Sequence, residues 1–184
     1  MTPKKITRPK IPRETQIEVF FQDGWLCRWC HRPTVFAPAL KLLERFVRQA
    51  GYSHPTAYYD LRYRRDVAPM LDHLAAVIDH VKAYSRNGEH DKANFVTACN
   101  KCNIRKSART AEEYERQNPG RPVKGKYGEP EHWDGLVAVF MVLSAADPGQ
   151  LTPSERAWRL ALQDFLSQRS ATSSDRVLNA SVAS

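Results

Sequence analysis

The stretch that decides the fold is residues 77–106, which read VIDHVKAYSRNGEHDKANFVTACNKCNIRK. It begins with an apolar, β-branched run from Val77 to Val81, which predicts a strand. A polar loop follows, and then a second short strand candidate from Phe95 to Ala98. From Lys101 the pattern predicts a helix that continues into Glu115. The order strand, loop, strand, helix predicts a mixed α+β module with a cysteine pair at its last junction.

The four cysteines form two C-x2-C pairs, Cys27 with Cys30 and Cys99 with Cys102. The first residues lack the apolar stretch of a secretory signal, and no run reaches the roughly 18 apolar residues of a membrane span. We therefore expect a cytoplasmic protein with no membrane partner. In a reducing compartment, two close pairs favour metal ligation over disulfides. Four thiolates match a closed, structural zinc site, which would fix the position of the next residue, Asn103.

Length and charge add a second constraint. A chain of 184 residues suits one domain with appended elements, and 42% hydrophobic residues suffice for a packed core. The 28 Lys and Arg residues exceed the 20 Asp and Glu residues, which gives a net charge of +8. This excess fits a polyanionic partner such as DNA, because basic side chains displace the counterions of a phosphate backbone. Many basic proteins bind no nucleic acid, so the motifs must decide.

One combination of motifs is specific. An Asp79–His80 pair in a strand, Asn94 fourteen residues after the histidine, and C-x2-C-N-x2-K beyond it resemble the HNH endonuclease family, in its four-cysteine zinc subgroup. The resemblance covers the first cysteine pair and residues 77–106. It implies a ββα-metal core and a metal-dependent endonuclease that hydrolyses phosphodiester bonds, most naturally those of double-stranded DNA.

The residue types suit that chemistry independently. An unperturbed histidine changes charge near neutral pH, so His80 is of a residue type that can take a proton from water as a general base. The Asp79 carboxylate and the Asn103 carboxamide offer hard oxygen ligands for catalytic Mg²⁺ or Mn²⁺. The resemblance implies the same roles, and it implies that Asn94 braces the loop and orients His80 by hydrogen bonds. Because neighbouring strand side chains point to opposite faces, we expect the strand to end or twist at His80.

Two positions depart from the family pattern. Lys82 stands where the family often has proline, a change that we expect to be tolerated. Asn103 stands where the last metal position is often histidine. An amide oxygen in place of an imidazole nitrogen should favour Mg²⁺ or Mn²⁺ over softer ions.

Basic residues near the motif are candidates for DNA contact. Lys106 follows Asn103 by three residues and shares its helix face, so Lys106 and the neighbouring Arg105 could contact the phosphate backbone. The alternative is a solvated helix face. Arg86, in the loop between the strands, is the third candidate.

Several histidines lie outside the motif. A competing pair, Asp72 with His73, has a helical context and the wrong spacing to Asn94, so we interpret it as a surface or packing pair. We expect His90 to be an ordinary polar residue, although its place in the loop facing the cleft makes it the one to follow. The same interpretation applies to His31, His54 and His132.

The rest of the chain predicts appended parts. We expect a basic flexible arm at 1–15, a nuclease domain at 16–115 with an insertion at 32–76, a C-terminal helical extension at 116–168 and a disordered tail at 169–184. The arm is either solvated or lies along a nucleic-acid backbone.

The insertion and the extension each contain helix signals. In the insertion, apolar spacing predicts a helix from Ala37 to Ala50. The Tyr and Arg residues at 58–65 then form either a base-stacking surface or an irregular segment. In the extension, the sequence predicts a core helix that is apolar nearly all round from Asp134 to Ala145. A second helix opens with a capping box at Thr152 to Glu155.

Two other function classes explain the motifs less completely than a nuclease. A zinc-stabilised nucleic-acid-binding module without cleavage activity would have no chemical need to retain His80, both oxygen ligands and Asn94 together. A thiol redox protein would need an accessible cysteine of low pKa and would leave Asp79 and Asn103 unexplained. A DNA-cutting enzyme is therefore the predicted function.

Overall fold

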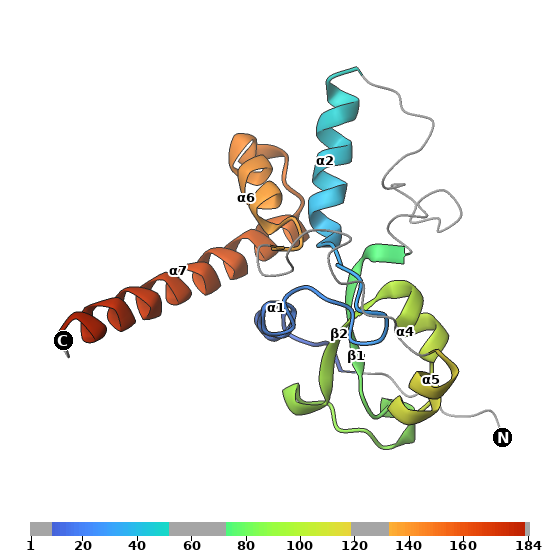
Figure 1. Ribbon diagram of the computed structural model, residues 1–184. Helices are drawn as coiled ribbons and strands as arrows, with labels where there is room; N and C mark the ends of the chain where they lie inside the picture. The colour runs from blue at the N-terminus through green and yellow to red at the C-terminus, as the bar shows by residue number, and fades with distance from the viewer. Residues whose placement is uncertain (1–8, 52–72, 119–132, 183–184) are drawn as a thin grey trace.

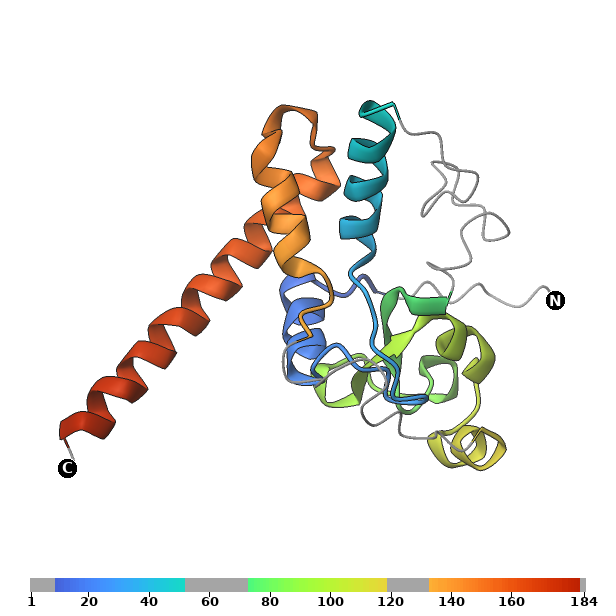
Figure 2. The same ribbon diagram turned by 45° about the horizontal axis from the view of Figure 1, so that its top comes forward.

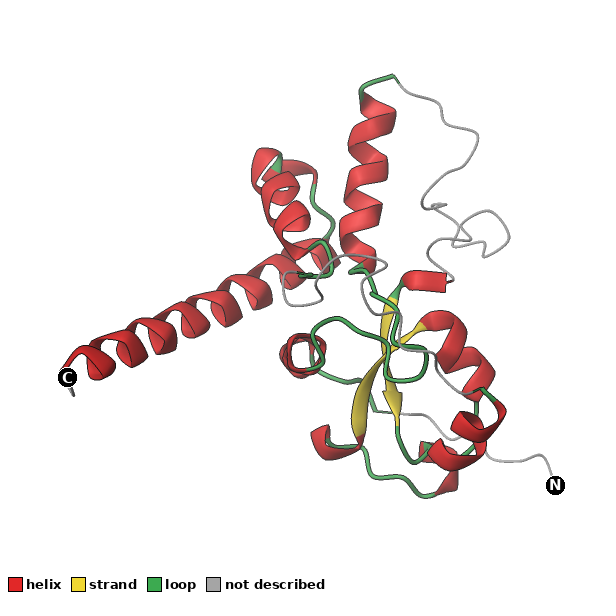
Figure 3. Cartoon of the chain, in the orientation of Figure 1, coloured by secondary structure: helices red, strands yellow, loops and turns green. Residues whose placement is uncertain are grey.

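The computed structural model describes residues 9–51, 73–118 and 133–182 (Figure 1). A two-stranded sheet with short helices beside it forms one part of the molecule, and longer helices packed around a shared hydrophobic core form the other (Figures 1 and 3). This arrangement confirms the expected α+β class with a ββα core. The helices and strands are α1 (Arg13–Gln22), α2 (Ala37–Gln49), β1 (Ala76–His80), β2 (Phe95–Cys99), α4 (Asn100–Lys106), α5 (Ala111–Gln117), α6 (Val137–Ala146) and α7 (Pro153–Val182).

The two strands form an antiparallel hairpin whose register runs from Ala76 opposite Cys99 to His80 opposite Phe95. Strand alternation gives the hairpin two different faces. Ile78 packs against the large hydrophobic core, whereas Val77 packs against the cysteine cluster. β1 ends at His80, as expected from the need to bring two neighbouring side chains to one site.

The helix predicted from Lys101 into Glu115 is interrupted, so that prediction is wrong. α4 ends at Lys106, and Ser107 takes a φ of +51°. α5 then starts afresh behind a capping box, in which Thr110 and Glu113 each accept a hydrogen bond from the other's backbone N–H. Such a box is a helix-start signal, and the sequence interpretation overlooked it.

The large core joins α1, α2, α6 and α7 through aromatic rings. Trp25 lies 4.9 Å from Phe20 and 6.0 Å from Phe36 between ring centroids, and Phe36 lies 5.1 Å from Phe140. The helix predicted for Ala37 to Ala50 is confirmed as α2. α6 was predicted to be apolar core nearly all round. In the structure only one face is buried, and Val142 on the other face is 68% exposed.

α7 begins with the expected capping box between Thr152 and Glu155. It continues to Val182, through much of the segment for which the composition predicted disorder (169–184). Residues 154–182 contain no Pro or Gly to stop a helix, which explains the difference. Figures 1 and 2 show this helix extending away from the rest of the molecule.

Other predictions are partly or wholly outside the described residues. α1 starts at Arg13, inside the range expected for the flexible arm, and residues 1–8 are not described. The Tyr and Arg residues at 58–65 and the residues Asp72, His54 and His132 also lie outside. None of the described helices combines the length and the apolar character that crossing a membrane requires.

Candidate active site and metal centre

The four cysteine sulfurs converge as predicted. Every Sγ lies within 4.8 Å of the other three, and the sulfurs of Cys30 and Cys99 are 3.9 Å apart. Tetrahedral Zn–S bonds of about 2.3 Å place the sulfurs about 3.8 Å from one another. The amino-terminal pair sits on a tight turn, in which His31 donates its backbone N–H to the Cys27 carbonyl at 2.8 Å and takes a φ of +56°. The cluster has the geometry of a metal site.

The thiols also perturb one another. Hydrogen bonding with Cys102, the largest influence, lowers the pKa of Cys27 to about 7. The same contact acts in the opposite direction on the partner, because hydrogen bonding with Cys27 raises the pKa of Cys102. Four neighbouring sulfurs cannot all become thiolates unless a cation balances their charge. The donor set therefore fits a divalent metal ion.

A tryptophan inside the first cysteine turn connects the metal centre to the candidate active site. Trp29 is 2% exposed and donates its indole N–H to Oδ2 of Asp79 at 2.8 Å. The other carboxylate oxygen accepts the backbone N–H of His80 at 2.8 Å. Because Trp29 lies between Cys27 and Cys30, whatever orders that turn also orders Asp79.

Lys106 corrects a prediction. Its side chain is fully buried, so it is neither a solvated residue nor a contact for a DNA phosphate in this structure. Its ammonium donates to the His80 carbonyl at 2.7 Å and lies 3.4 Å from Oδ2 of Asp79. The ammonium also lies 5.2 Å from the centre of the Trp29 ring. Helical spacing placed Lys106 on the Asn103 side, but the packing of α4 on the hairpin turned it inward.

Two opposing effects act on the Asp79 carboxyl. Burial raises the pKa of this carboxyl above its usual value, and the nearby Lys106 ammonium and the Trp29 indole offset part of that rise by favouring the ionised form. A buried carboxylate needs such partners to remain charged. Lys106 and Trp29 therefore hold Asp79 in place and support its negative charge.

His80, the next residue along β1, lies among aromatic rings. Its ring meets the Phe95 ring edge-on at 5.0 Å and has the Tyr84 ring 6.0 Å away. Nε2 of His80 is 3.2 Å from Nδ1 of His90. His90, which was expected to be an ordinary polar residue, therefore contacts the His80 ring directly. Its position in the loop was the one sequence signal that pointed to this contact.

Asn94 braces the loop between the strands. Its side chain accepts from the backbone N–H of Lys82 at 2.9 Å and donates to the carbonyls of Lys82 at 2.9 Å and Glu89 at 2.8 Å. Gly88 is needed for the same compact loop, because a Cβ there would lie 1.9 Å from the Lys82 carbonyl oxygen. The contacts of Asn94 join the segment directly after His80 to the segment directly before His90.

A small polar pocket of about 220 Å³ lies at the end of β1. Asp79, His80 and Asn103 all line it, so three of the four predicted catalytic residues share one site, and Asn94 stands behind it. The exposed Ile104 lies beside Asn103 at the same pocket. The remaining lining residues are Ala83, Tyr84, Ser85, Ser107 and Ala108.

The two other candidate DNA contacts differ from Lys106. Arg105 is exposed on α4. Arg86 is half-exposed and lies 3.4 Å from the Glu113 carboxylate on α5. Both can be approached from solvent, although Arg86 would have to exchange one anionic partner for another.

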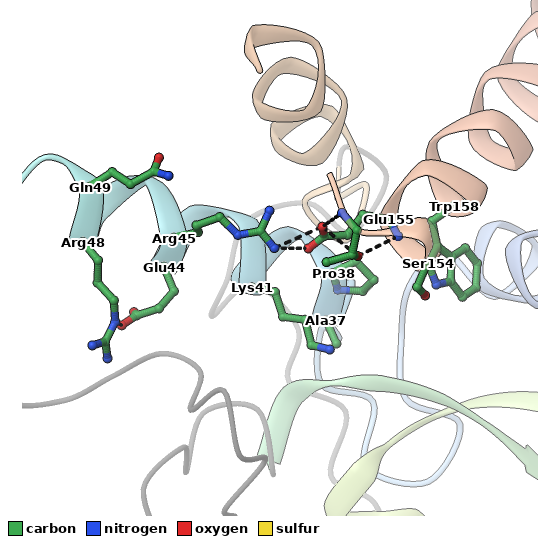
Figure 4. Close-up of a pocket in the computed structure, with 11 residues that line it drawn as sticks. Ala37, Pro38, Lys41, Glu44, Arg45, Arg48, Gln49, Ser154, Glu155 and Trp158 are labelled. Atoms are coloured by element: carbon green, nitrogen blue, oxygen red, sulfur yellow. Dashed lines mark hydrogen bonds and ion pairs between the residues drawn. The ribbon is translucent and has the colours of Figure 1, made fainter. Parts of the chain in front are cut away.

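The structure also contains a larger groove of about 540 Å³, between α2 and the start of α7 (Figure 4). Its basic side chains have acidic partners. Arg45 pairs with Glu155 at 2.8 Å, and Arg48 pairs with Glu44 at 2.6 Å. The two carboxylates of this groove are thus paired with arginines, and none of its described lining residues is a histidine.

Comparison with known proteins agrees with the motif. Residues 69–109 match the family model of the HNH endonucleases, which confirms the resemblance recognised in the sequence. The match spans both strands, α4 and every predicted residue of the pocket. Searches of curated proteins and of solved structures found no match. The family match indicates a nuclease or nucleic-acid-binding function.

Proposed function

We propose, on the premise that residues 69–109 form an HNH endonuclease motif, that this protein hydrolyses DNA phosphodiester bonds with the help of a divalent cation. The observation that supports this most strongly is the shared pocket at the end of β1. There a histidine, a carboxylate and a carboxamide from two elements line one polar cavity. Double-stranded DNA is the proposed substrate, which the basic character of the chain favours.

His80 is the proposed general base. It would take a proton from the attacking water, and the His80 ring would be steadied by its contacts with Phe95 and His90. In-line attack by that water would leave a 5′-phosphate and a 3′-hydroxyl, as the family resemblance implies. Among the described residues that line the pocket, His80 is the one outside the proposed ion ligands whose side chain can take a proton near neutral pH.

Asp79 and Asn103 are the proposed ligands of Mg²⁺ or Mn²⁺. Both supply hard oxygen atoms to the same polar pocket, which is the donor chemistry that these ions prefer. A bound ion would neutralise charge on the phosphate and on the departing oxygen. Trp29 and Lys106 keep Asp79 oriented and ionised, while the position of Asn103 next to Cys102 ties it to the cysteine cluster.

The cysteine cluster is proposed to hold a structural Zn²⁺. All four donors are sulfurs, and three of them are buried. Four sulfurs fill the four positions of a tetrahedral zinc site. Zinc there would fix the Trp29 turn and the start of α4, and thereby both proposed ligands of the catalytic ion. Arg105 and Arg86 are proposed to contact the DNA backbone beside the pocket.

A second candidate is a zinc-stabilised nucleic-acid-binding module that does not cut. One observation favours it: both oxygens of Asp79 already accept hydrogen bonds, and a buried ammonium lies beside one of them. A carboxylate with these partners offers less free coordination to a cation. The nuclease remains the better account because a binding module has no use for His80 in the same pocket.

Incubation of zinc-loaded protein with supercoiled plasmid tests this choice. The nuclease predicts nicked or linear product with Mg²⁺ or Mn²⁺, no product in excess Ca²⁺ or without added divalent ion, and ends that DNA ligase can reseal. A parallel incubation with an RNA of the same sequence tests the substrate class. Binding of the plasmid without cleavage under all of these conditions would favour the non-cutting module.

A further inference from the structure

His90 is the closest polar neighbour of the His80 ring among the hydrogen bonds described here. Its Nδ1 lies 3.2 Å from Nε2 of His80, and the two ring centroids are 5.3 Å apart at an interplanar angle of 33°. The distance is that of a hydrogen bond, so one nitrogen donates and the other accepts. No role in the proposed reaction has yet been given to His90.

We propose that His90 is a positioning residue that accepts a hydrogen bond from Nε2–H of His80 and thereby fixes the tautomer and the ring orientation of the general base. The inference rests on the proposed function, because it assigns His80 its role as a base. A neutral imidazole has one N–H and one basic nitrogen. With its proton held on Nε2, His80 takes the proton of water at Nδ1.

The proposed role of His80 requires His90 to accept at Nδ1, because a basic Nδ1 on His80 leaves the His80 ring proton on Nε2, the atom that faces His90. When Nδ1 accepts, the ring proton of His90 sits on Nε2, and that atom is buried without a described hydrogen-bond partner. The proton therefore has no described group to which it could pass. His90 would act through the orientation and polarity of its ring and would not relay the proton onward. When water gives its proton to Nδ1, His80 becomes an imidazolium, and the contact with the His90 lone pair stabilises that charge.

The loop holds His90 in this position. The Asn94 side chain bonds the carbonyl of Glu89, the residue directly before His90, and both backbone groups of Lys82, two residues after His80. Phe95 and Tyr84 meet the His90 ring edge-on at 5.2 Å and 5.6 Å. Asn94 was expected to orient His80. It does so indirectly, because its hydrogen bonds hold together the segment after His80 and the segment before His90, and these segments carry the two paired rings.

Two variants separate positioning from simple packing. His90→Phe keeps an aromatic ring against Tyr84 and Phe95 but has no acceptor, whereas His90→Asn loses the ring but keeps an acceptor at the place of Nδ1. If His90 positions the base, His90→Phe lowers kcat by about 10- to 100-fold with little change in KM, and His90→Asn recovers most of that loss. A packing role predicts the reverse order in both kcat and melting temperature.

A second measurement does not depend on cleavage. In protein with ¹⁵N-labelled histidine, loaded with zinc and held at pH 8, the ring nitrogen shifts of His80 report which nitrogen carries the proton. We expect the Nε2–H tautomer in the wild type and in His90→Asn, and a mixture in His90→Phe. His80→Gln identifies the signals.

The outcomes distinguish this inference from the proposed function. A dominant Nδ1–H tautomer of His80 in the wild type, or a tautomer unchanged by His90→Phe, would overturn the role of His90 even if the protein cuts DNA. A wild-type protein that shows the expected tautomer but cuts no DNA would uphold the contact and refute the nuclease.

Discussion

The helical part and the hairpin part of this molecule have hydrophobic clusters of different composition. In the helical part, large rings and aliphatic side chains from α1, α2, α6 and α7 bury one another, with Trp25, Phe36 and Phe140 near the centre. In the hairpin part, the buried cluster consists mainly of the cysteines, Ala98, Trp29 and Tyr114. Hydrophobic burial can stabilise the first part, whereas the buried cluster of the second contains few large apolar side chains, and its proposed Zn²⁺ would supply stability there.

The difference explains where a catalytic site can be placed. A site needs buried polar groups, such as Asp79 and Lys106, which would destabilise an aromatic core. In the hairpin part, the proposed Zn²⁺ would fix the backbone, so these polar groups could be held without a large core around them. β1 belongs to both parts, because Ile78 faces the helices and Val77 faces the cysteines.

Removal of zinc should have the largest effect, and it should destabilise the hairpin part far more than the helical part. Structural zinc sites contribute apparent binding free energies of about 10 kcal/mol or more, which is comparable to the whole stability of a domain. We expect chelation to abolish amide-exchange protection in β1, β2 and α4 and to lower it much less in α6. Elemental analysis should find one zinc per chain, and zinc should restore protection. Unchanged protection in metal-free protein would contradict the proposal.

The helical part should be most sensitive at Gly135. This residue has a φ of +68°, and a Cβ would lie 2.2 Å from the Trp25 ring. We expect Gly135→Ala to lower the free energy of unfolding by about 3 kcal/mol, from backbone strain and overpacking together. Gly51 is the matched control, because its φ is +84° but a Cβ would meet nothing within 4 Å. Gly51→Ala should cost about 1 kcal/mol. Equal losses in urea unfolding would show that the Trp25 contact is unimportant.

Two tryptophans allow the parts to be compared by the same substitution. Trp29 donates its indole N–H to Asp79, and Trp133 donates its own to the Thr34 carbonyl at 2.7 Å. Each Trp→Phe change should destabilise the protein by about 1–2 kcal/mol, because each removes a hydrogen-bond donor from a buried acceptor: the Thr34 carbonyl loses its described donor, and Oδ2 of Asp79 keeps only the Lys106 ammonium. Trp29→Phe should also lower cleavage by about 10-fold or more, since Asp79 loses a group that orients it. An equal effect of Trp133→Phe on cleavage would argue against that link.

The smallest expected effect concerns the two helix caps. Burial acts to raise the pKa of Glu155, but hydrogen bonds from Thr152 and Arg45 outweigh it, so this pKa lies below its usual value. A lowered pKa stabilises the fold above the unfolded-state pKa of about 4.3, and the benefit disappears as the pH falls through the folded-state pKa. Glu155→Gln should therefore cost about 1 kcal/mol at pH 7 and progressively less below pH 4.

Glu113 caps α5 in the same manner but is exposed to solvent. Glu113→Gln is therefore the control in the hairpin part, and we expect a smaller change in the free energy of unfolding at pH 7 than for Glu155→Gln. A cost of Glu155→Gln that stays constant from pH 7 to pH 3 would contradict the assignment of this effect to the carboxylate.

Much of the hairpin part could be predicted because its signals are local. The β-branched run, the spacing from Asp79 to Asn103 and the two C-x2-C pairs gave both strands and the cysteine cluster. The contacts that tune the site could not be predicted. Trp29 and Asp79 are 50 positions apart, and the indole finds the carboxylate only because the cysteine turn docks on one face of β1.

The burial of Lys106 could not be predicted from the sequence either, although Lys106 is only three residues from Asn103. Helical spacing placed it near Asn103, but its burial depends on how α4 packs on the hairpin, which no periodicity reports. His90 and His80 meet because Asn94 and Gly88 compact the loop between them. Single residues with a role in tertiary contacts thus leave little trace in a sequence pattern.

The central claim is that His80 is the base of a DNA-cutting reaction. The most direct measurement is the single-turnover rate of plasmid nicking in Mg²⁺ by zinc-loaded wild type and His80→Ala, at protein concentrations that saturate the DNA. Loss of a general base predicts a rate lower by about 100-fold or more, with DNA affinity and bound zinc unchanged. Nicking by His80→Ala at the wild-type rate would contradict the account.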